Sequence, residues 1–255
     1  MPVKKTATSG TKGGGKGGTL VPPQGIPNFY DIMPKSFIPT YHNPNFESHK
    51  MKIPARMLII GSSGSGKTQL ALEIIRQMKE TFGLLCLCVK NADEPIYNFL
   101  RSKLKPEDVQ VYENGAVPNV KDFKDVDSQI LCIFDDLVNE PKKVQEAITN
   151  FYIYGRKGAK NNKGITCMYL SQSYFGIPKT IRLQANYVFL KKIASLRDLH
   201  MLMRDHNLNL SKQELTTLYQ HCTDSIQNFM MIDLEAPPEN RFRKNFDMVF
   251  DIPLS

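Results

Sequence analysis

One stretch of the chain has the residue types and spacing of a loop that holds phosphate groups. Its residues are Gly61, Ser62, Ser63, Gly64, Ser65, Gly66, Lys67 and Thr68. Glycines let the backbone curl so that its N–H groups face a phosphate, and the amino end of a following helix adds positive potential. Lys67 can reach the β- and γ-phosphates of a nucleoside triphosphate, and Thr68 can ligate Mg²⁺. The stretch therefore predicts a binding site for ATP and Mg²⁺.

The segments on either side of this loop have the patterns that a phosphate loop requires. Residues 57–60 are a short apolar run and predict a buried strand that leads into the loop. Residues 68–80 predict a helix that leads out of it, because Leu70, Ile74 and Met78 recur every fourth residue. A strand, a glycine-rich loop and a helix in this order place the helix amino end against the phosphates.

Two acidic residues, Asp135 and Asp136, follow the apolar run 130–134. The run predicts a buried central strand, and ligands of open α/β sheets bind at the carboxyl ends of such strands. We expect Asp135 to hold Mg²⁺, directly or through water. We expect Asp136 to polarise the attacking water, although it is one methylene shorter than the glutamate more common in this role. The alternative is that the two acids only cap a strand before a loop.

A second apolar strand, residues 165–171, ends at Gln172. If this strand lies between the phosphate-loop strand and the acidic strand, it brings Gln172 near the γ-phosphate. A neutral amide there can orient water or respond to loss of the phosphate. The alternative is that Gln172 is an ordinary polar loop residue.

The segment 154–164 contains four cations and no acid. It can reach the nucleotide of a neighbouring subunit, follow DNA phosphates, or do both; the alternative is a solvated basic loop. An arginine that reaches a neighbour's nucleotide stabilises the charge of the transition state. Arg156 is our candidate for this catalytic role, and Arg182 and Arg197 are its rivals.

The hydrophobic pattern predicts an α/β fold with a mostly parallel sheet covered by helices on both faces, because strands alternate with helical segments. The expected strands are 57–60, 84–89, 109–112, 130–134, 165–171, 187–190 and 227–232. The expected helices are 68–80, 94–103, 141–154, 195–205 and 211–221. We expect four parts: a flexible basic tail (1–19), an extended arm rich in proline and aromatic residues (20–50), the nucleotide-binding domain (51–235) and a C-terminal tail (236–255).

Composition narrows the class of protein. The 255 residues carry a net charge of +8, which permits a polyanionic partner without proving one. No apolar run approaches the length of a membrane span, and the amino end has no apolar stretch typical of a secretory signal. The cysteines form no C-x-x-C pair, and four lie in expected strands, so buried reduced thiols are expected. They are Cys86, Cys88, Cys132, Cys167 and Cys222.

Taken together, these motifs resemble the HerA/FtsK superfamily of P-loop ATPases, and within it the poxvirus-type genome-packaging ATPases of large DNA viruses and virophages. The resemblance covers roughly residues 50–235. Its specific marks are the pair Asp135-Asp136, the loop beginning Gly155-Arg156, the stretch 170–175 around Gln172 and the stretch 177–182, Ile-Pro-Lys-Thr-Ile-Arg. It implies a P-loop fold with an added strand between the phosphate-loop strand and the acidic strand.

The same resemblance implies a homo-oligomeric ring, a hexamer or pentamer, that pumps double-stranded DNA into a preformed capsid in the host cytoplasm. A capsid protein is then a further expected partner. Three other classes stay open from the residues alone: a helicase or chromosome-partition motor, a small-molecule kinase with a phosphate loop, and a scaffold that binds nucleotide without hydrolysing it.

Overall fold

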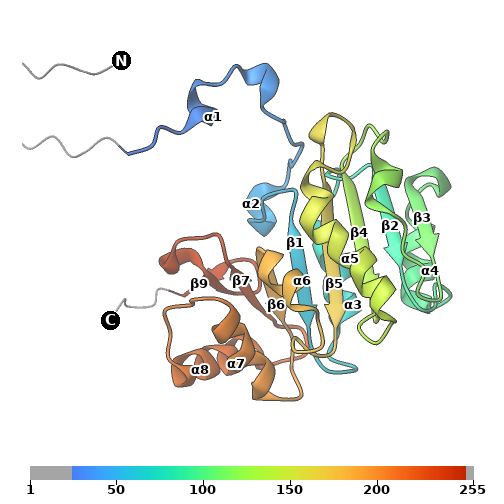
Figure 1. Cartoon of the computed structure of the whole chain (residues 1–255). Coiled ribbons are helices and arrows are strands. Elements are labelled where there is room, and N and C mark those ends of the chain that lie inside the picture. Colours follow the sequence, from blue (N-terminus) through green and yellow to red (C-terminus); the bar gives the residue numbers. More distant parts are fainter. Residues whose placement is uncertain (1–24, 251–255) are drawn as a thin grey trace, which may run out of the picture. The chain divides into compact units, whose positions relative to one another are not determined.

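A computed structural model of the chain describes residues 25–250, and its contacts divide the chain after Ile38 (Figure 1). The part before the division contains helix α1 (Phe29–Ile32) and a 3-10 helix (Lys35–Phe37). The side chain of Asn28 caps α1 by accepting a hydrogen bond from the backbone N–H of Tyr30 at 3.2 Å. The basic tail expected for residues 1–19 lies outside the described residues.

The part that begins at Pro39 is built on a nine-stranded sheet with the order β3-β2-β4-β5-β1-β6-β7-β8-β9 (Figure 1). The strands are β1 (Arg56–Ile60), β2 (Leu84–Cys88), β3 (Val109–Tyr112), β4 (Ile130–Asp135), β5 (Ile165–Ser171), β6 (Tyr187–Leu190), β7 (Met230–Asp233), β8 (Phe242–Lys244) and β9 (Met248–Val249). Strands β1 to β6 pair in parallel, and β7 to β9 add antiparallel pairs. The expected α/β fold is confirmed, and β5 lies between β4 and β1 as predicted.

Helices cover both faces of this sheet. They are α2 (Phe46–His49), α3 (Lys67–Gln77), α4 (Pro95–Ser102), α5 (Lys142–Tyr154), α6 (Lys179–Gln184), α7 (Leu196–Asp205) and α8 (Lys212–Cys222). Helices α3 and α4 pack on the face that receives Met57 and Ile59, whereas α5 to α8 pack on the face that receives Leu58 and Ile60 (Figure 1). Because alternate residues of a strand point to opposite faces, a strand buried on both faces reads as a continuous apolar run.

The element boundaries differ from the sequence prediction at the C-terminal end. Strands β8 and β9 lie inside the segment expected to be a tail, so the sheet extends further along the chain than predicted. Within β8 only Phe242 is fully buried, and its basic neighbours hide the strand pattern. Helix α6 was also not predicted, because its six residues are too few to show a helical period.

Residues 39–50, which the sequence assigned to an arm, group with the nucleotide-binding part. The backbone N–H of His42 donates to Gln129 Oε1 at 2.6 Å, and Gln129 Nε2 donates back to the carbonyl of His42 at 2.8 Å. Gln129 directly precedes β4, so this exchange fixes residues near His42 to the amino ends of the strands.

The five cysteines are free and buried, as expected. Cys86, Cys132 and Cys167 are register partners on the adjacent strands β2, β4 and β5, where they belong to one apolar cluster. Within residues 25–250, we find no helix with the length and hydropathy needed to span a membrane.

Candidate active site

The phosphate loop connects the carboxyl end of β1 to the amino end of α3. Gly66 has φ +86°, a conformation that glycine adopts without a steric penalty. A Cβ added at Gly61 would lie 2.4 Å from Ser65 Oγ, so a larger residue would collide with the loop itself. The buried hydroxyl of Ser65 has no hydrogen-bond partner among the described residues. A tightly curled loop that contains an unpartnered buried donor is suited to an anion with several oxygens.

Lys67 begins α3, and its ammonium group donates to the carbonyl of Ser62 at 3.2 Å. Its side chain thus arches back over the loop, where the phosphates of a nucleotide would lie. Burial lowers the pKa of Lys67, while the carboxylates of Asp135 and Asp136 oppose that effect. The two acids therefore lie close enough to Lys67 to stabilise its charge.

Asp135 ends β4 and faces the phosphate loop. The hydroxyl of Thr68 donates to Asp135 Oδ2 at 3.2 Å, and the hydroxyl of Tyr97 donates to the same oxygen. Burial raises the pKa of Asp135, and the hydrogen bonds from Tyr97 and Thr68 and the charge of Lys67 oppose this. The predicted association of Thr68 with Asp135, 67 residues away in the sequence, is thus present as a direct contact.

Tyr97 is a residue of this site that the sequence reasoning missed. It lies in α4 and is 2% exposed, and burial together with the charge of Asp135 raises its pKa, so its hydroxyl stays a donor. Nothing in the local pattern of α4 distinguishes Tyr97 from an ordinary core tyrosine. Only the position of α4 beside the end of β4 reveals its contact with Asp135.

Asp136 and Gln172 lie next to each other beyond the ends of β4 and β5. Gln172 Nε2 donates to Asp136 Oδ1 at 3.5 Å, which is at the long limit for a hydrogen bond. Asp136 has φ +55°, an uncommon backbone conformation that aspartate tolerates better than most residues. Both side chains are exposed. The added strand β5, whose position the sequence predicted, therefore places Gln172 beside Asp136.

The neighbours of Gln172 fix its loop rather than face the site. Ser173 Oγ donates to Asp198 Oδ1 at 3.0 Å, and the backbone N–H of Phe175 donates to the same oxygen at 2.9 Å. Asp198 is 7% exposed and lies in the first turn of α7. Helix α7 therefore holds the loop that carries Gln172.

The three candidate arginines occupy different environments. Arg182 is buried, pairs with Asp205 at 2.7 Å and donates to the carbonyl of Ile177 at 2.8 Å, so its guanidinium group already has partners inside its own subunit. Arg197 is exposed, and its guanidinium carbon lies 4.2 Å from the ring centre of Phe175, in the loop that follows Gln172.

Arg156 lies near the amino ends of the strands, whereas the phosphate loop lies at their carboxyl ends. It belongs to the 3-10 helix Gly155–Lys157, which packs against the start of β5: a Cβ added at Gly155 would lie 3.4 Å from the carbonyl oxygen of Ile165. The phosphate loop follows Ile60, whose register partner is Ser171 at the other end of β5. Arg156 is therefore too distant to act on the nucleotide of its own subunit, and only a neighbouring site could use it.

Comparison with known proteins assigns the family. The model of the family described as poxvirus A32 protein matches residues 44–234, about three quarters of the chain. The chain belongs to the poxvirus A32 protein family. The match spans the phosphate loop, the acidic pair, Gln172 and the three candidate arginines, so every candidate site residue lies inside the region that defines the family. No curated protein matches the chain.

Solved structures give the same fold for this A32-family chain. B204, the DNA-packaging ATPase from Sulfolobus turreted icosahedral virus, matches at 13% identity and a TM-score of 0.51, covering 76% of this chain and 98% of B204. The genome-packaging NTPase B204 from Sulfolobus turreted icosahedral virus 2, in complex with sulfate, matches at 13% identity and a TM-score of 0.51, covering 76% and 97%. EssC (ATPases 2 and 3) from Geobacillus thermodenitrificans matches at 11% identity and a TM-score of 0.50, covering 80% and 40%.

Proposed function

We propose that this A32-family protein is an ATP-hydrolysing motor that moves double-stranded DNA into a viral capsid. The observation that carries the proposal is the meeting of Lys67, Thr68, Asp135, Asp136 and Gln172 at one edge of the sheet. A site that only binds nucleotide needs the metal ligands Thr68 and Asp135. It needs neither the second carboxylate, Asp136, nor the amide of Gln172. Family membership favours the packaging motor over a helicase or a kinase, and B204 shares the fold.

The metal side of the site fits Mg²⁺. The hydroxyl of Thr68 and the carboxylate of Asp135 are hard oxygen donors that lie 3.2 Å apart, and oxygen donors are the ligands that Mg²⁺ prefers. We propose that Thr68 and Asp135 hold it, with Tyr97 orienting Asp135. When bound, Mg²⁺ neutralises charge on the β- and γ-phosphate oxygens.

The water side of the site is formed by Asp136 and Gln172. Their side chains are exposed and 3.5 Å apart, so one water molecule can contact both. We propose that Gln172 orients the attacking water and that Asp136 accepts a proton from it as its oxygen bonds to the γ-phosphorus. The bond from the γ-phosphorus to the β–γ bridging oxygen breaks in the same step, and ADP leaves with the electron pair of that bond. Lys67 stabilises the negative charge that develops on the γ-phosphate oxygens during this step.

A basic hollow supports DNA as the polymer that is moved. The hollow encloses about 490 Å³, and its lining includes Lys121, Lys124, Tyr154, Arg156 and Lys157 but no acidic residue. Lys124 lies 3.9 Å from the exposed Asp125, and the other three cations form no ion pair with any residue in the range 25–250. Cations and tyrosine hydroxyls that are free to contact phosphates bind DNA without reading its sequence, which suits a motor.

A ring would bring a neighbour's arginine to each site. We propose Arg156 or Arg197 for this role and not Arg182, because the guanidinium group of Arg182 pairs with Asp205 inside its own subunit. Removal of the correct arginine should reduce turnover about 10³- to 10⁵-fold.

Mixing subunits tests this shared site. Lys67→Ala subunits keep both arginines, and Arg156→Ala or Arg197→Ala subunits keep an intact phosphate loop. Some junctions in a mixed ring then combine an intact loop with an intact arginine, so ATP turnover should partly recover for the correct arginine. Arg182→Ala mixtures are the comparison, since that variant loses an internal ion pair. Failure of both the Arg156 and the Arg197 mixtures to recover would argue against a shared site.

Two further parts of the proposal concern where the motor works and what anchors it. The motor would work in the host cytoplasm, where virions assemble, and a capsid protein would hold the ring at the portal of entry. Stimulation of ATP hydrolysis by duplex DNA, with no phosphorylated small molecule formed, separates this motor from a kinase. An assay of strand separation separates it from a helicase.

A further inference from the structure

The loop that joins α8 to β7 lies against the phosphate loop. A Cβ added at Gly66 would lie 3.9 Å from the carbonyl oxygen of Ile226. The ammonium group of Lys191 donates to this same carbonyl and to the carbonyl of Asn228 at 3.0 Å. Lys191 directly follows β6 and is 3% exposed, and its Cβ would lie 2.7 Å from a Cβ added at Gly61. Lys191 therefore links this loop, residues 224–228, to both ends of the phosphate loop.

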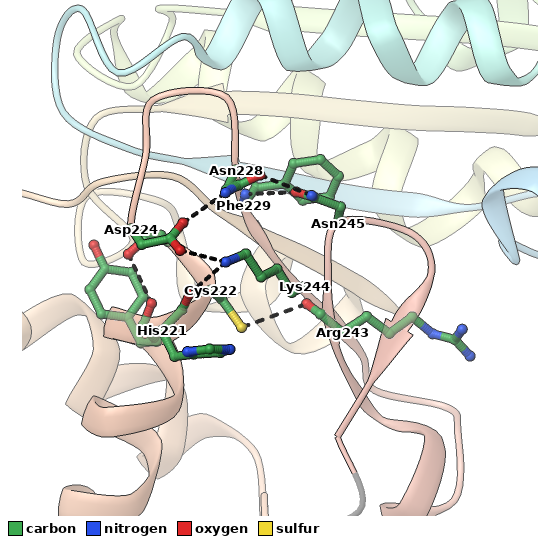
Figure 2. Close-up of polar contacts among 10 residues, drawn as sticks. His221, Cys222, Asp224, Asn228, Phe229, Arg243, Lys244 and Asn245 are labelled. Atoms are coloured by element: carbon green, nitrogen blue, oxygen red, sulfur yellow. Dashed lines mark hydrogen bonds and ion pairs between the residues drawn. The ribbon is translucent and has the colours of Figure 1, made fainter.

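A polar network holds the other side of the 224–228 loop (Figure 2). Lys244 Nζ on β8 donates to Asp224 Oδ2 at 2.6 Å and to the carbonyl of His221 at 3.1 Å. Asn228 Nδ2 donates to Asp224 Oδ1 at 2.7 Å, and Asn228 Oδ1 accepts from Asn245 Nδ2 at 3.0 Å. The side chains of Asp224 and Asn228 are thus already paired within the protein. Ile226, between them, is 58% exposed.

The positions of the catalytic groups set the direction of a bound nucleotide. Asp135, Asp136 and Gln172 lie at the ends of β4 and β5, on one side of β1, and the γ-phosphate must lie near them. Strands β6 and β7 lie on the other side of β1. A triphosphate that fills the phosphate loop with its γ end toward β4 has its nucleoside end toward the β6 side, where the 224–228 loop lies.

We infer that the 224–228 loop forms the nucleoside side of the site and that the side chain of Ile226 packs against the base. The inference rests on the proposed nucleotide site. Because Asp224 and Asn228 are already paired, their side chains are not free to read the edge of a base, whereas Ile226 offers an exposed apolar surface on which a base can pack.

The variant Ile226→Ala tests this inference by comparing ATP with inorganic tripolyphosphate, which lacks a nucleoside. Loss of most of one aliphatic contact should weaken ATP binding about 10-fold. Tripolyphosphate binding, measured by its competition with a fluorescent nucleotide, should stay unchanged. The matched control is Ile32→Ala, which truncates a 72% exposed isoleucine on α1. It should bind both ligands like the unmodified protein.

A second variant tests the support of the loop without touching the phosphate loop or Ile226. Lys244→Met removes the ion pair with Asp224, and it should weaken ATP binding less than Ile226→Ala does while sparing tripolyphosphate. Equal weakening of ATP and tripolyphosphate in Ile226→Ala, or no weakening of either, would overturn the inference. Binding of ATP without DNA-stimulated turnover in the unmodified protein would instead count against the motor and leave this inference standing.

Discussion

Replacement of Lys67 with alanine is expected to abolish ATP turnover. The ammonium group of Lys67 lies over the phosphate loop, 3.2 Å from the carbonyl of Ser62. It is half-buried, and the carboxylates of Asp135 and Asp136 act on its charge. Without it, the proposed Mg²⁺ alone would offset the repulsion between those two carboxylates and the triphosphate. A single donor to a developing oxyanion is worth about 10²–10³ in rate, and a desolvated cation should be worth at least as much.

The measurement is steady-state ATP hydrolysis with nucleotide affinity measured in parallel. Lys79→Ala is the matched control, because Lys79 is an exposed lysine that follows the same helix. Within residues 25–250, its side chain forms an ion pair only with the adjacent Glu80, at 3.4 Å. That variant should turn over ATP normally. Unchanged turnover in Lys67→Ala would remove the phosphate-loop assignment on which the proposed function depends.

Replacement of Asp136 with asparagine is expected to stop hydrolysis while leaving nucleotide binding largely intact. Asparagine keeps the shape of the side chain and also tolerates the φ of +55° at this position, so the backbone need not change. It loses the charge that accepts a proton from water. A positioned general base contributes about 10²–10⁴ in rate, which is the loss expected here.

The comparison variant is Asp136→Glu, which restores the carboxylate and adds one methylene. Since Gln172 lies 3.5 Å from the present carboxylate, the longer side chain moves the water only slightly, and part of the turnover should return. Nucleotide affinity distinguishes a general base from a metal ligand at Asp136. If Asp136→Asn loses binding and not only turnover, Asp136 is a metal ligand and the water must be activated by another group.

The sequence predicted those parts of the site that one segment specifies by itself. The phosphate loop and the acid pair each follow an apolar strand, and both patterns are local. The place of β5 between β4 and β1 was also predictable. The apolar strand that follows the acids ends at Gln172, and Gln172 can act near the γ-phosphate only if that strand lies between β4 and β1.

Contacts between distant segments were not predictable from one sequence. Tyr97 lies 38 residues from Asp135, and Lys191 lies 35 residues from Ile226, with no pattern joining either pair. The same limit affected the arginines. Arg182 resembled a free arginine in the sequence, but the fold places it against Asp205, 23 residues away. Arg156 was a candidate for a neighbour's site, and the fold adds that it lines a basic hollow at the opposite sheet edge.

The role of the basic hollow in DNA binding can be tested by measuring how duplex DNA stimulates ATP hydrolysis. The double variant Lys121→Ala/Lys157→Ala removes two cations from the hollow. Its matched control is Lys105→Ala/Lys212→Ala, which removes the same charge from two exposed lysines elsewhere on the described surface. Because phosphate contacts make DNA binding sensitive to salt, the first variant should lose stimulation by DNA at a lower salt concentration than the control.

ATP hydrolysis measured with and without duplex DNA, together with the mass of the particle in solution, tests the motor most directly. The account predicts turnover that rises on addition of duplex DNA of any sequence, falls back as salt increases, and comes from a particle of several subunits. A strictly monomeric protein whose ATP turnover does not respond to duplex DNA would contradict it.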